Sequence, residues 1–170
     1  MKNVKFHPKI ERYPEASLGR EYDFQIACAK LGPHAVIGGM SALFYYNLVE
    51  QVPKQTWVLV PPHKITSNRS YRLIRTQTPL DKGIVAGNGY QVASIERAIM
   101  EGFKLASKIG ERTAIHACRT AIQQKQTTLK KIGMTAKELG LGLLEGNKSS
   151  FEMVRSCFLS RGLSPRYGVM

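Results

Sequence analysis

Acidic residues are scarce in this sequence, and their scarcity limits the chemistry that we expect of it. Only 12 Asp and Glu stand against 25 Lys and Arg, and Asp23 and Asp81 are the only aspartates. Acid–base enzymes and metal-dependent nucleases need carboxylates that lie close together. No stretch of this sequence pairs an acid with a nearby Glu-x-Lys segment. We therefore expect a protein without catalytic residues, which is not an enzyme.

The motifs that bind nucleotides, activate a nucleophile or hold a metal are also missing. The sequence has no GxxxxGK[ST], no GxGxxG followed by an acid and no GxSxG. Its three cysteines are far apart and form no CxxC pair, which argues against a disulfide framework and against a zinc site. None of the four histidines lies at ligand spacing from another. We expect no cofactor and no bound metal.

Long apolar runs are absent as well. No run approaches the roughly 18 residues that span a bilayer. The first residues are basic but lack the apolar block of a secretory signal. We therefore expect a protein that has no contact with membranes and lies in the cytoplasm.

Positive charge is what the sequence has in excess. The net charge of +13 favours a polyanion as the partner. The cations gather in residues 51–90, which hold a single acid, and in residues 119–137, which hold none. A surface that keeps the protein soluble and a surface that binds an acidic protein fit the same pattern. Charge alone therefore leaves nucleic acid, an acidic partner and solubility as open alternatives.

Hydrophobic periodicity predicts an α+β fold, in which helices flank a small sheet of short strands and the C-terminal half is helical. Helices are predicted over 22–31, 41–48, 94–106 and 112–123, with further helices starting near 135 and near 150. Strands are predicted over 56–60 and 71–76, with two more around the turn at 88–89. We expect the strands at 56–60 and 71–76 to form a hairpin or a neighbouring pair.

Two glycines, Gly38 and Gly39, stand before an apolar helix and allow two interpretations. A glycine pair at a helix start can hold a phosphate, or it can turn the chain tightly. The segment MSALFYYNLV contains no Lys or Arg, so it is a poor recognition helix for DNA. We expect the two glycines to turn the chain into a buried helix.

Glu96 and Arg97 begin a helix directly after a strand. A carboxylate in the first turn is favoured by the helix dipole. We expect a surface ion pair that joins the strand to the helix, and the alternative is that Arg97 faces a partner.

Three segments resemble the C-terminal domain of the AbiEi antitoxins, the transcriptional-regulator half of a type IV toxin–antitoxin pair. They are HAVIGGMSALFYYNLVEQVPKQTWVLVP (34–61), GYQVASIERAIMEGF (89–103) and the helical tail that runs to TAKELG (135–140). A helix with a Ser-Ala-Leu start, a proline followed by a strand, and a helix that opens with Glu-Arg occur in that family in the same order.

The resemblance implies a bacterial protein that binds promoter DNA as a transcriptional regulator and counteracts a nucleotidyltransferase-like toxin. Such antitoxins carry a winged helix before the Ser-Ala-Leu helix, whereas we find no clear winged helix in the residues that precede it here. We accordingly divide the chain into a tail or lead-in over 1–20, an antitoxin-like domain over 21–145 and a C-terminal helix and tail over 146–170.

The cationic clusters supply the candidate binding residues. The connection between the strands at 56–60 and 71–76 is polar and basic, so it can follow a phosphate backbone. The candidates for contact with nucleic acid or a partner are Lys64, Arg69, Arg72, Arg75, Lys130 and Lys131. Because alternation puts Arg72 and Arg75 on opposite faces of a strand, we favour Lys64, Arg69 and Arg72 over Arg75. The alternative function is a stand-alone protein that binds DNA or RNA, with Tyr71 as a stacking platform.

Overall fold

The structure is a computed structural model that describes residues 18–141 of the chain. Residues 1–17 of the lead-in predicted over 1–20 lie outside the described residues. The C-terminal helix and tail predicted over 146–170 lie outside them entirely.

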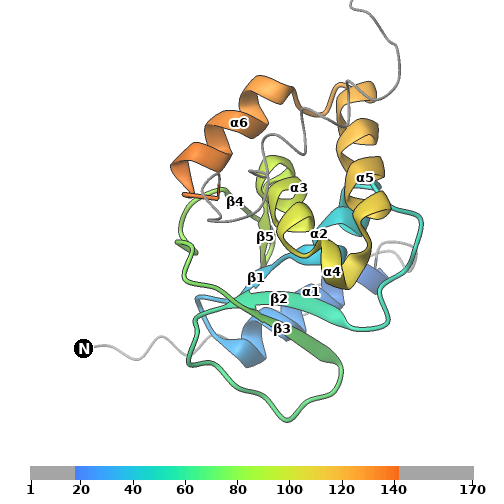
Figure 1. Cartoon of the computed structure of the whole chain (residues 1–170). Helices are drawn as coiled ribbons and strands as arrows, with labels where there is room; N and C mark the ends of the chain where they lie inside the picture. Colours follow the sequence, from blue (N-terminus) through green and yellow to red (C-terminus); the bar gives the residue numbers. More distant parts are fainter. Residues whose placement is uncertain (1–17, 142–170) are drawn as a thin grey trace, which may run out of the picture.

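The described chain begins with a helix, a strand and a helix, continues with four consecutive strands and ends with four helices (Figure 1). The helices are α1 (Leu18–Leu31), α2 (Gly39–Tyr45), α3 (Ile95–Lys104), α4 (Ala106–Ile109), α5 (Glu111–Gln123) and α6 (Leu129–Glu138). The strands are β1 (Val36–Ile37), β2 (Thr56–Val60), β3 (Tyr71–Arg75), β4 (Ile84–Ala86) and β5 (Gln91–Ala93). The expected α+β class is confirmed.

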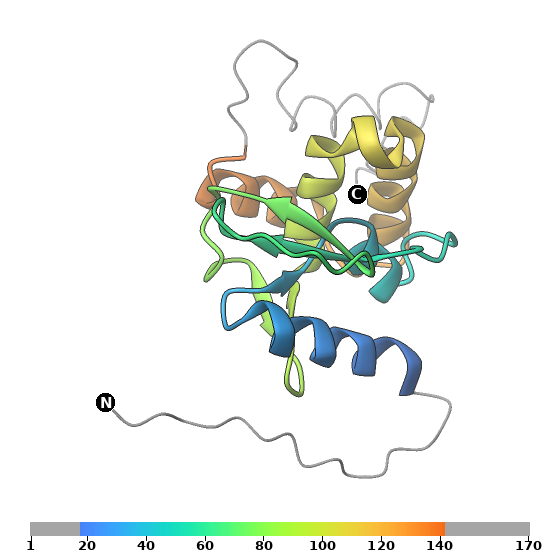
Figure 2. The same ribbon diagram turned by 90° about the horizontal axis from the view of Figure 1, so that it is seen from below.

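The five strands form one mixed sheet in the order β3-β2-β1-β5-β4. β1 pairs with β2 in the antiparallel sense and with β5 in the parallel sense, and β4 and β5 are antiparallel. Figure 2 shows α1 on one face of the sheet and the other helices on the opposite face. Because both faces of β2 are covered, every residue from Trp57 to Val60 is buried.

β2 and β3 are neighbours, as expected, but they are parallel and not a hairpin. Thr56 pairs with Tyr71 and Val60 with Arg75, so the chain must return along the whole length of β2 before β3 begins. Five residues of strand span about 17 Å. The connection over residues 61–70 is long enough to cover that distance, since extended chain reaches about 3.3 Å per residue.

The helix start predicted near residue 135 is wrong. α6 begins at Leu129, because the side chain of Thr128 accepts a hydrogen bond from the backbone N–H of Lys131 and so caps the helix. Thr135 lies inside α6. The start predicted at Ser94 is confirmed, since the Ser94 hydroxyl accepts from the backbone N–H of Arg97.

Gly38 and Gly39 turn the chain into a buried helix, as expected. A Cβ at Gly39 would lie 2.7 Å from the Trp57 ring, and one at Gly38 would lie 2.5 Å from Leu59. Gly39 also has a φ of +51°, which favours glycine. The hydroxyl of buried Ser41 accepts from the Trp57 backbone N–H at 2.9 Å, so the start of α2 is locked against β2. The space beside the glycines is filled by side chains of β2 and by Ile74 of β3.

Candidate nucleic-acid interface

β3 is an edge strand of the sheet, and it presents two exposed arginines, Arg72 and Arg75. Its pairing with β2 is regular over five residues, without a bulge. The two arginines therefore point to opposite faces, as the alternation predicts. Charged side chains at a strand edge also oppose pairing with another sheet, so these arginines have a protective role in the fold as well.

Arg72 stacks on an aromatic ring. Its guanidinium carbon lies 4.3 Å from the centre of the Trp57 ring, and Trp57 is itself buried beneath α2. A cation over an aromatic face is held by the ring quadrupole. The stacking therefore fixes the position of an exposed positive charge on the face of the sheet that carries α2.

Arg75 is tied to the loop between β2 and β3. Its Nε donates to the backbone oxygen of Lys64 at 3.0 Å. The other end of the loop is held where Nε2 of Gln55 donates to the backbone oxygen of Arg69 at 2.7 Å. Inside the loop, Oδ1 of Asn68 accepts from the backbone N–H of Ser70 at 2.9 Å. These bonds order the backbone of a loop whose Arg69 side chain is exposed.

The structure groups the predicted cations differently from the sequence. Half-buried Lys64 lies with Arg75, and its Nζ approaches Gly32 at the end of α1. Arg72 lies on the opposite face with Trp57. Lys130 and Lys131 are exposed on α6, which Figure 1 places across the molecule from β3.

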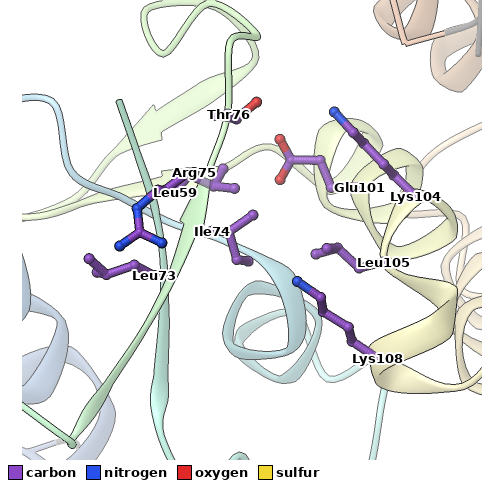
Figure 3. A pocket seen from close by; sticks show the side chains of 9 residues that line it. All are labelled: Leu59, Leu73, Ile74, Arg75, Thr76, Glu101, Lys104, Leu105 and Lys108. Carbon is purple, nitrogen blue, oxygen red and sulfur yellow. The ribbon is translucent and has the colours of Figure 1, made fainter. Parts of the chain in front are cut away.

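A cavity of about 240 Å³ opens beside the end of β3, on the face that carries the helices (Figure 3). Its apolar walls come from β2, β3 and the junction of α3 with α4. Two exposed cations, Lys104 and Lys108, border it on the helical side. Arg75 also lines the cavity, but its guanidinium points to the opposite face of β3, where Nε bonds Lys64. Buried Thr76 and Glu101 supply polar groups.

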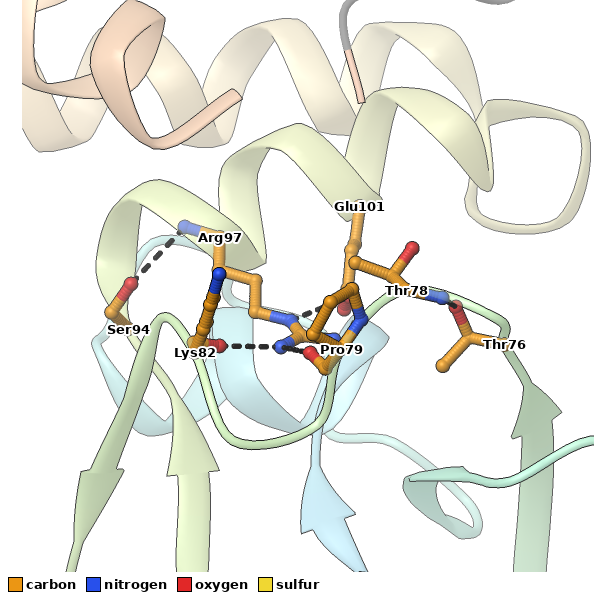
Figure 4. Close-up of polar contacts among 7 residues, drawn as sticks. All are labelled: Thr76, Thr78, Pro79, Lys82, Ser94, Arg97 and Glu101. Carbon is orange, nitrogen blue, oxygen red and sulfur yellow. Dashed lines mark hydrogen bonds and ion pairs between the residues drawn. The ribbon is translucent and has the colours of Figure 1, made fainter. Parts of the chain in front are cut away.

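Arg97 is fully buried and holds the loop between β3 and β4 in place (Figure 4). Its Nη1 donates to the backbone oxygens of Pro79 and Lys82, each at 2.6 Å. Its Nε donates to Oε1 of Glu101 at 2.8 Å. Arg97 therefore holds the loop against the first turns of α3.

The expected surface pair of Glu96 with Arg97 is wrong, because each residue has a different partner. Arg97 pairs with Glu101 in the interior, and Oε1 of Glu96 accepts from the Thr127 hydroxyl at 2.6 Å. Neighbours in sequence point in different directions from a helix, whereas residues four apart share a face. The expectation that the segment joins the strand to the helix holds, through these other contacts.

Glu101 is the buried acid of this region. Burial raises the pKa of its carboxyl, and the nearby Arg97 guanidinium and Lys104 ammonium offset only part of that rise. Its second oxygen, Oε2, has no hydrogen-bond partner among the described residues. Nη2 of Arg97 is also buried without a partner, so each member of this ion pair leaves one polar atom unpaired, which is costly.

The sequence reasoning missed the cavity residues. Glu101, Lys104 and Lys108 follow one another at helical spacing, so that pattern would have placed them on one side of a helix. It would not have revealed their proximity to Arg75 and Thr76, which come from β3 and the residue after it.

The strand aromatics pack into the domain. Trp57 is buried, and half-buried Tyr71 packs against the core. Burial raises the pKa of the Tyr71 hydroxyl. The Trp57 ring carries the Arg72 guanidinium on its face, so that face is not open to an unpaired base.

Within residues 18–141, no three His, Cys, Asp or Glu side chains gather in a way that would hold a metal ion. The same residues include no helix with the length and apolar character needed to cross a bilayer. Comparison of the sequence with models of protein families and with curated proteins finds no match.

Proposed function

We propose that this protein is a non-catalytic, antitoxin-like protein that binds nucleic acid, most readily duplex DNA, through the edge of its sheet. The observation that carries the proposal is the ordered cationic edge formed by β3 and the loop before it. Arg72 is fixed on Trp57, and Arg75 is bonded to the loop backbone at Lys64. Cations that are already held in position lose less conformational freedom when they meet phosphates.

The same edge also fits an acidic protein. The resemblance to the AbiEi antitoxins supports a nucleotidyltransferase-like toxin as that partner, and such a protein would meet the cations through its own carboxylates. The resemblance also supports a bacterial cytoplasmic protein. The alternative function is a stand-alone nucleic-acid-binding protein, and it uses the same cations without a toxin.

A salt titration of duplex DNA binding tests the proposal. Each phosphate that a cation neutralises releases counterions, so the affinity should fall steeply as the salt concentration rises. The exposed arginines Arg69, Arg72 and Arg75 are changed together to Glu. We expect binding at low salt to weaken by at least about tenfold and the log–log salt slope to flatten by about one unit per lost contact.

A matched control keeps the net charge of the triple variant. Lys30, Arg112 and Lys137 are exposed cations on α1, α5 and α6. Their change to Glu alters the charge of the protein equally, and we expect a smaller loss of affinity. Equal losses in the two folded variants would reject the edge of the sheet as the binding site.

The same titration separates the two kinds of partner. If the wild-type protein fails to bind any duplex at low salt, the nucleic-acid function is rejected and the acidic protein partner remains. A nucleotidyltransferase-like reading frame next to this gene then identifies the protein to be tested by pull-down with the same two variants.

A further inference from the structure

The cavity beside the end of β3 lies between two walls of different character. Ile74 of β3 forms an apolar surface on one side. On the other side, Leu105 lies between two exposed lysines, Lys104 and Lys108. Figure 3 shows both lysine side chains extending from the helical wall, with Ile74 pointing towards Leu105. An apolar wall therefore faces a cationic one.

The positive charge of the helical wall is not balanced by the acid beneath it. Glu101 is only 4% exposed, and its carboxylate forms an ion pair with the buried guanidinium of Arg97. The Lys104 ammonium lowers the pKa of that carboxyl less than Arg97 does. Neither Lys104 nor Lys108 forms an ion pair with a carboxylate among residues 18–141. The two ammonium groups therefore fit an anionic partner from outside these residues.

A third cation stands on the same face of β3. Arg72 pairs with Trp57 in the register of β3 with β2, and its guanidinium stacks on the Trp57 ring. A Cβ at Gly39 would meet both Trp57 and Ile74, so these two side chains lie on one face of the sheet. Arg72 and Ile74 therefore share a face of the strand, as residues two apart do. The cationic surface thus extends beyond the rim of the cavity.

The chain does not itself carry the complementary charge. Residues 1–17 contain four Lys or Arg and two Glu, and residues 142–170 contain the same numbers. A second copy of the chain brings a net charge of +13. Like charges oppose each of these as the occupant of a cationic surface, so charge complementarity favours a separate, acidic protein.

We propose that this cavity binds an extended acidic segment of a partner protein, in which one apolar side chain lies between two carboxylates. Alternate side chains of an extended chain lie on one side, about 6.7 Å apart. Lys104 and Lys108 are four residues apart, which is about 6 Å along a helix. Two carboxylates on one side of the segment therefore meet the two lysines, and the apolar side chain between them points the opposite way, towards Ile74.

The size of the cavity limits what it takes from such a segment. Its volume of about 240 Å³ is below the roughly 300–1,000 Å³ of pockets for drug-sized ligands. It therefore receives a single apolar side chain as an anchor, in the way that a few buried side chains carry much of the binding energy of protein interfaces.

The inference rests on the proposed function only for the class of partner, because it assigns the acidic protein considered there to a definite surface. Lys64 and the guanidinium of Arg75 lie on the opposite face of β3. Nucleic acid can therefore bind the edge of the sheet even if the cavity binds no protein segment, and the two proposals can fail separately.

The experiment follows the backbone amide resonances of the isotope-labelled full chain by NMR while a synthetic peptide is added. The salt concentration is about 0.15 M, at which exposed charges more than about 8 Å apart are screened. The peptide carries a central Glu-Leu-Glu sequence between serines and glycines. We expect shifts at Ile74, Leu105 and Lys108, with saturation at millimolar peptide or below.

Two comparison peptides test the two walls. One has alanine in place of the leucine and so lacks the apolar anchor, and the other has glutamines in place of both glutamates and so lacks the charges. We expect each to bind about tenfold or more weakly than the first peptide. Equal binding of the leucine and alanine peptides would show that charge alone attracts the peptide, and it would overturn the proposal. An absence of shifts at the cavity residues would do the same.

Two variants test the lysines. The change of Lys104 and Lys108 together to Glu should weaken binding of the first peptide by at least about tenfold, because it turns attraction into repulsion. The matched control changes Lys30 and Lys137, which are exposed on α1 and α6, to Glu. It alters the net charge equally and should weaken binding by less than about threefold, since its charges lie outside the cavity. Equal affinities of the two folded variants would overturn the proposal.

Duplex DNA added to the same two variants separates this inference from the proposed function. DNA binding that falls as much as peptide binding in the Lys104 and Lys108 variant would overturn the protein segment and make the cavity part of a nucleic-acid surface. Peptide binding that persists when the wild-type protein binds no duplex would support this inference and reject the nucleic-acid function. Duplex binding without peptide binding would do the reverse.

Discussion

Nε of Arg97 lies 2.8 Å from Oε1 of Glu101, one turn along α3, and both side chains are buried. The same guanidinium bonds two backbone oxygens of the loop between β3 and β4. One buried pair therefore positions that loop and orients the carboxylate that borders the cavity. The stability of the fold and the shape of the candidate site depend on the same contact.

Arg97→Ala should destabilise the protein strongly. The change leaves the Glu101 carboxylate buried without its ion-pair partner and removes the donor to Pro79 and Lys82. Breaking a buried pair in this way costs about 3–5 kcal/mol of unfolding free energy. Urea unfolding followed by circular dichroism measures the loss.

The double variant Arg97→Met with Glu101→Leu tests the cause of that loss. It replaces both charges with apolar groups, so no charge stays buried without its partner. We expect it to be more stable than Arg97→Ala, because a buried pair and its apolar replacement often have similar stability. A double variant that is no more stable than Arg97→Ala would show that the lost loop contacts, and not the unpaired buried charge of Glu101, cause most of the destabilisation.

Gly39→Ala should cost more than Gly140→Ala. Both glycines have positive φ, +51° and +64°, so both changes carry the same kind of backbone strain. A Cβ at Gly39 would also press on Trp57, whereas at Gly140 it would meet nothing within 4 Å. Overpacking adds about 1–3 kcal/mol to a backbone cost of about 1 kcal/mol. Equal unfolding free energies for the two variants would contradict the close contact with Trp57.

Thr128→Ala should destabilise the protein, and Thr135→Ala should not. Thr128 caps α6, so its loss costs about 1 kcal/mol. Thr135 lies inside the helix, where alanine has the higher helix propensity. Thermal unfolding of the two variants compares the start of α6 seen in the structure with the start predicted near residue 135.

The unfolding free energy should fall as the pH rises from 10 to about 12. Burial raises the pKa of the Tyr46 hydroxyl from 10.0 to about 12, with smaller contributions from Tyr45 and Glu96. The hydroxyl also donates to the backbone oxygen of Ala93 at 2.9 Å. A folded-state pKa above the unfolded-state value gives stability that is complete below pH 10 and is lost as the pH rises through the folded-state pKa.

Tyr46→Phe should therefore show a shallower loss of stability over this pH range than the wild-type protein. Urea unfolding at several pH values measures the difference. Tyr22→Phe, at an exposed position, serves as the control and should follow the wild-type curve. A Tyr46→Phe curve parallel to that of the wild type would place the alkaline transition in another group.

Local patterns in the sequence determined much of the fold. Ser94 marks a helix start because a hydroxyl at that position satisfies a free N–H of the first turn, whatever the rest of the chain does. The turn at Asn88-Gly89 joins two short antiparallel strands, β4 and β5, for an equally local reason. The strand at 56–60 and the α+β class follow from composition and periodicity.

The tertiary structure alone decided what depends on residues far apart in the chain. The parallel pairing of β2 with β3, the stacking of Arg72 on Trp57 and the cavity between β3 and α3 all join segments that no local pattern relates. Arg97 is the clearest case. A cation in the first turn of a helix is ordinarily expected at the surface. The loop oxygens and the Glu101 carboxylate that surround it explain why so polar a side chain is buried.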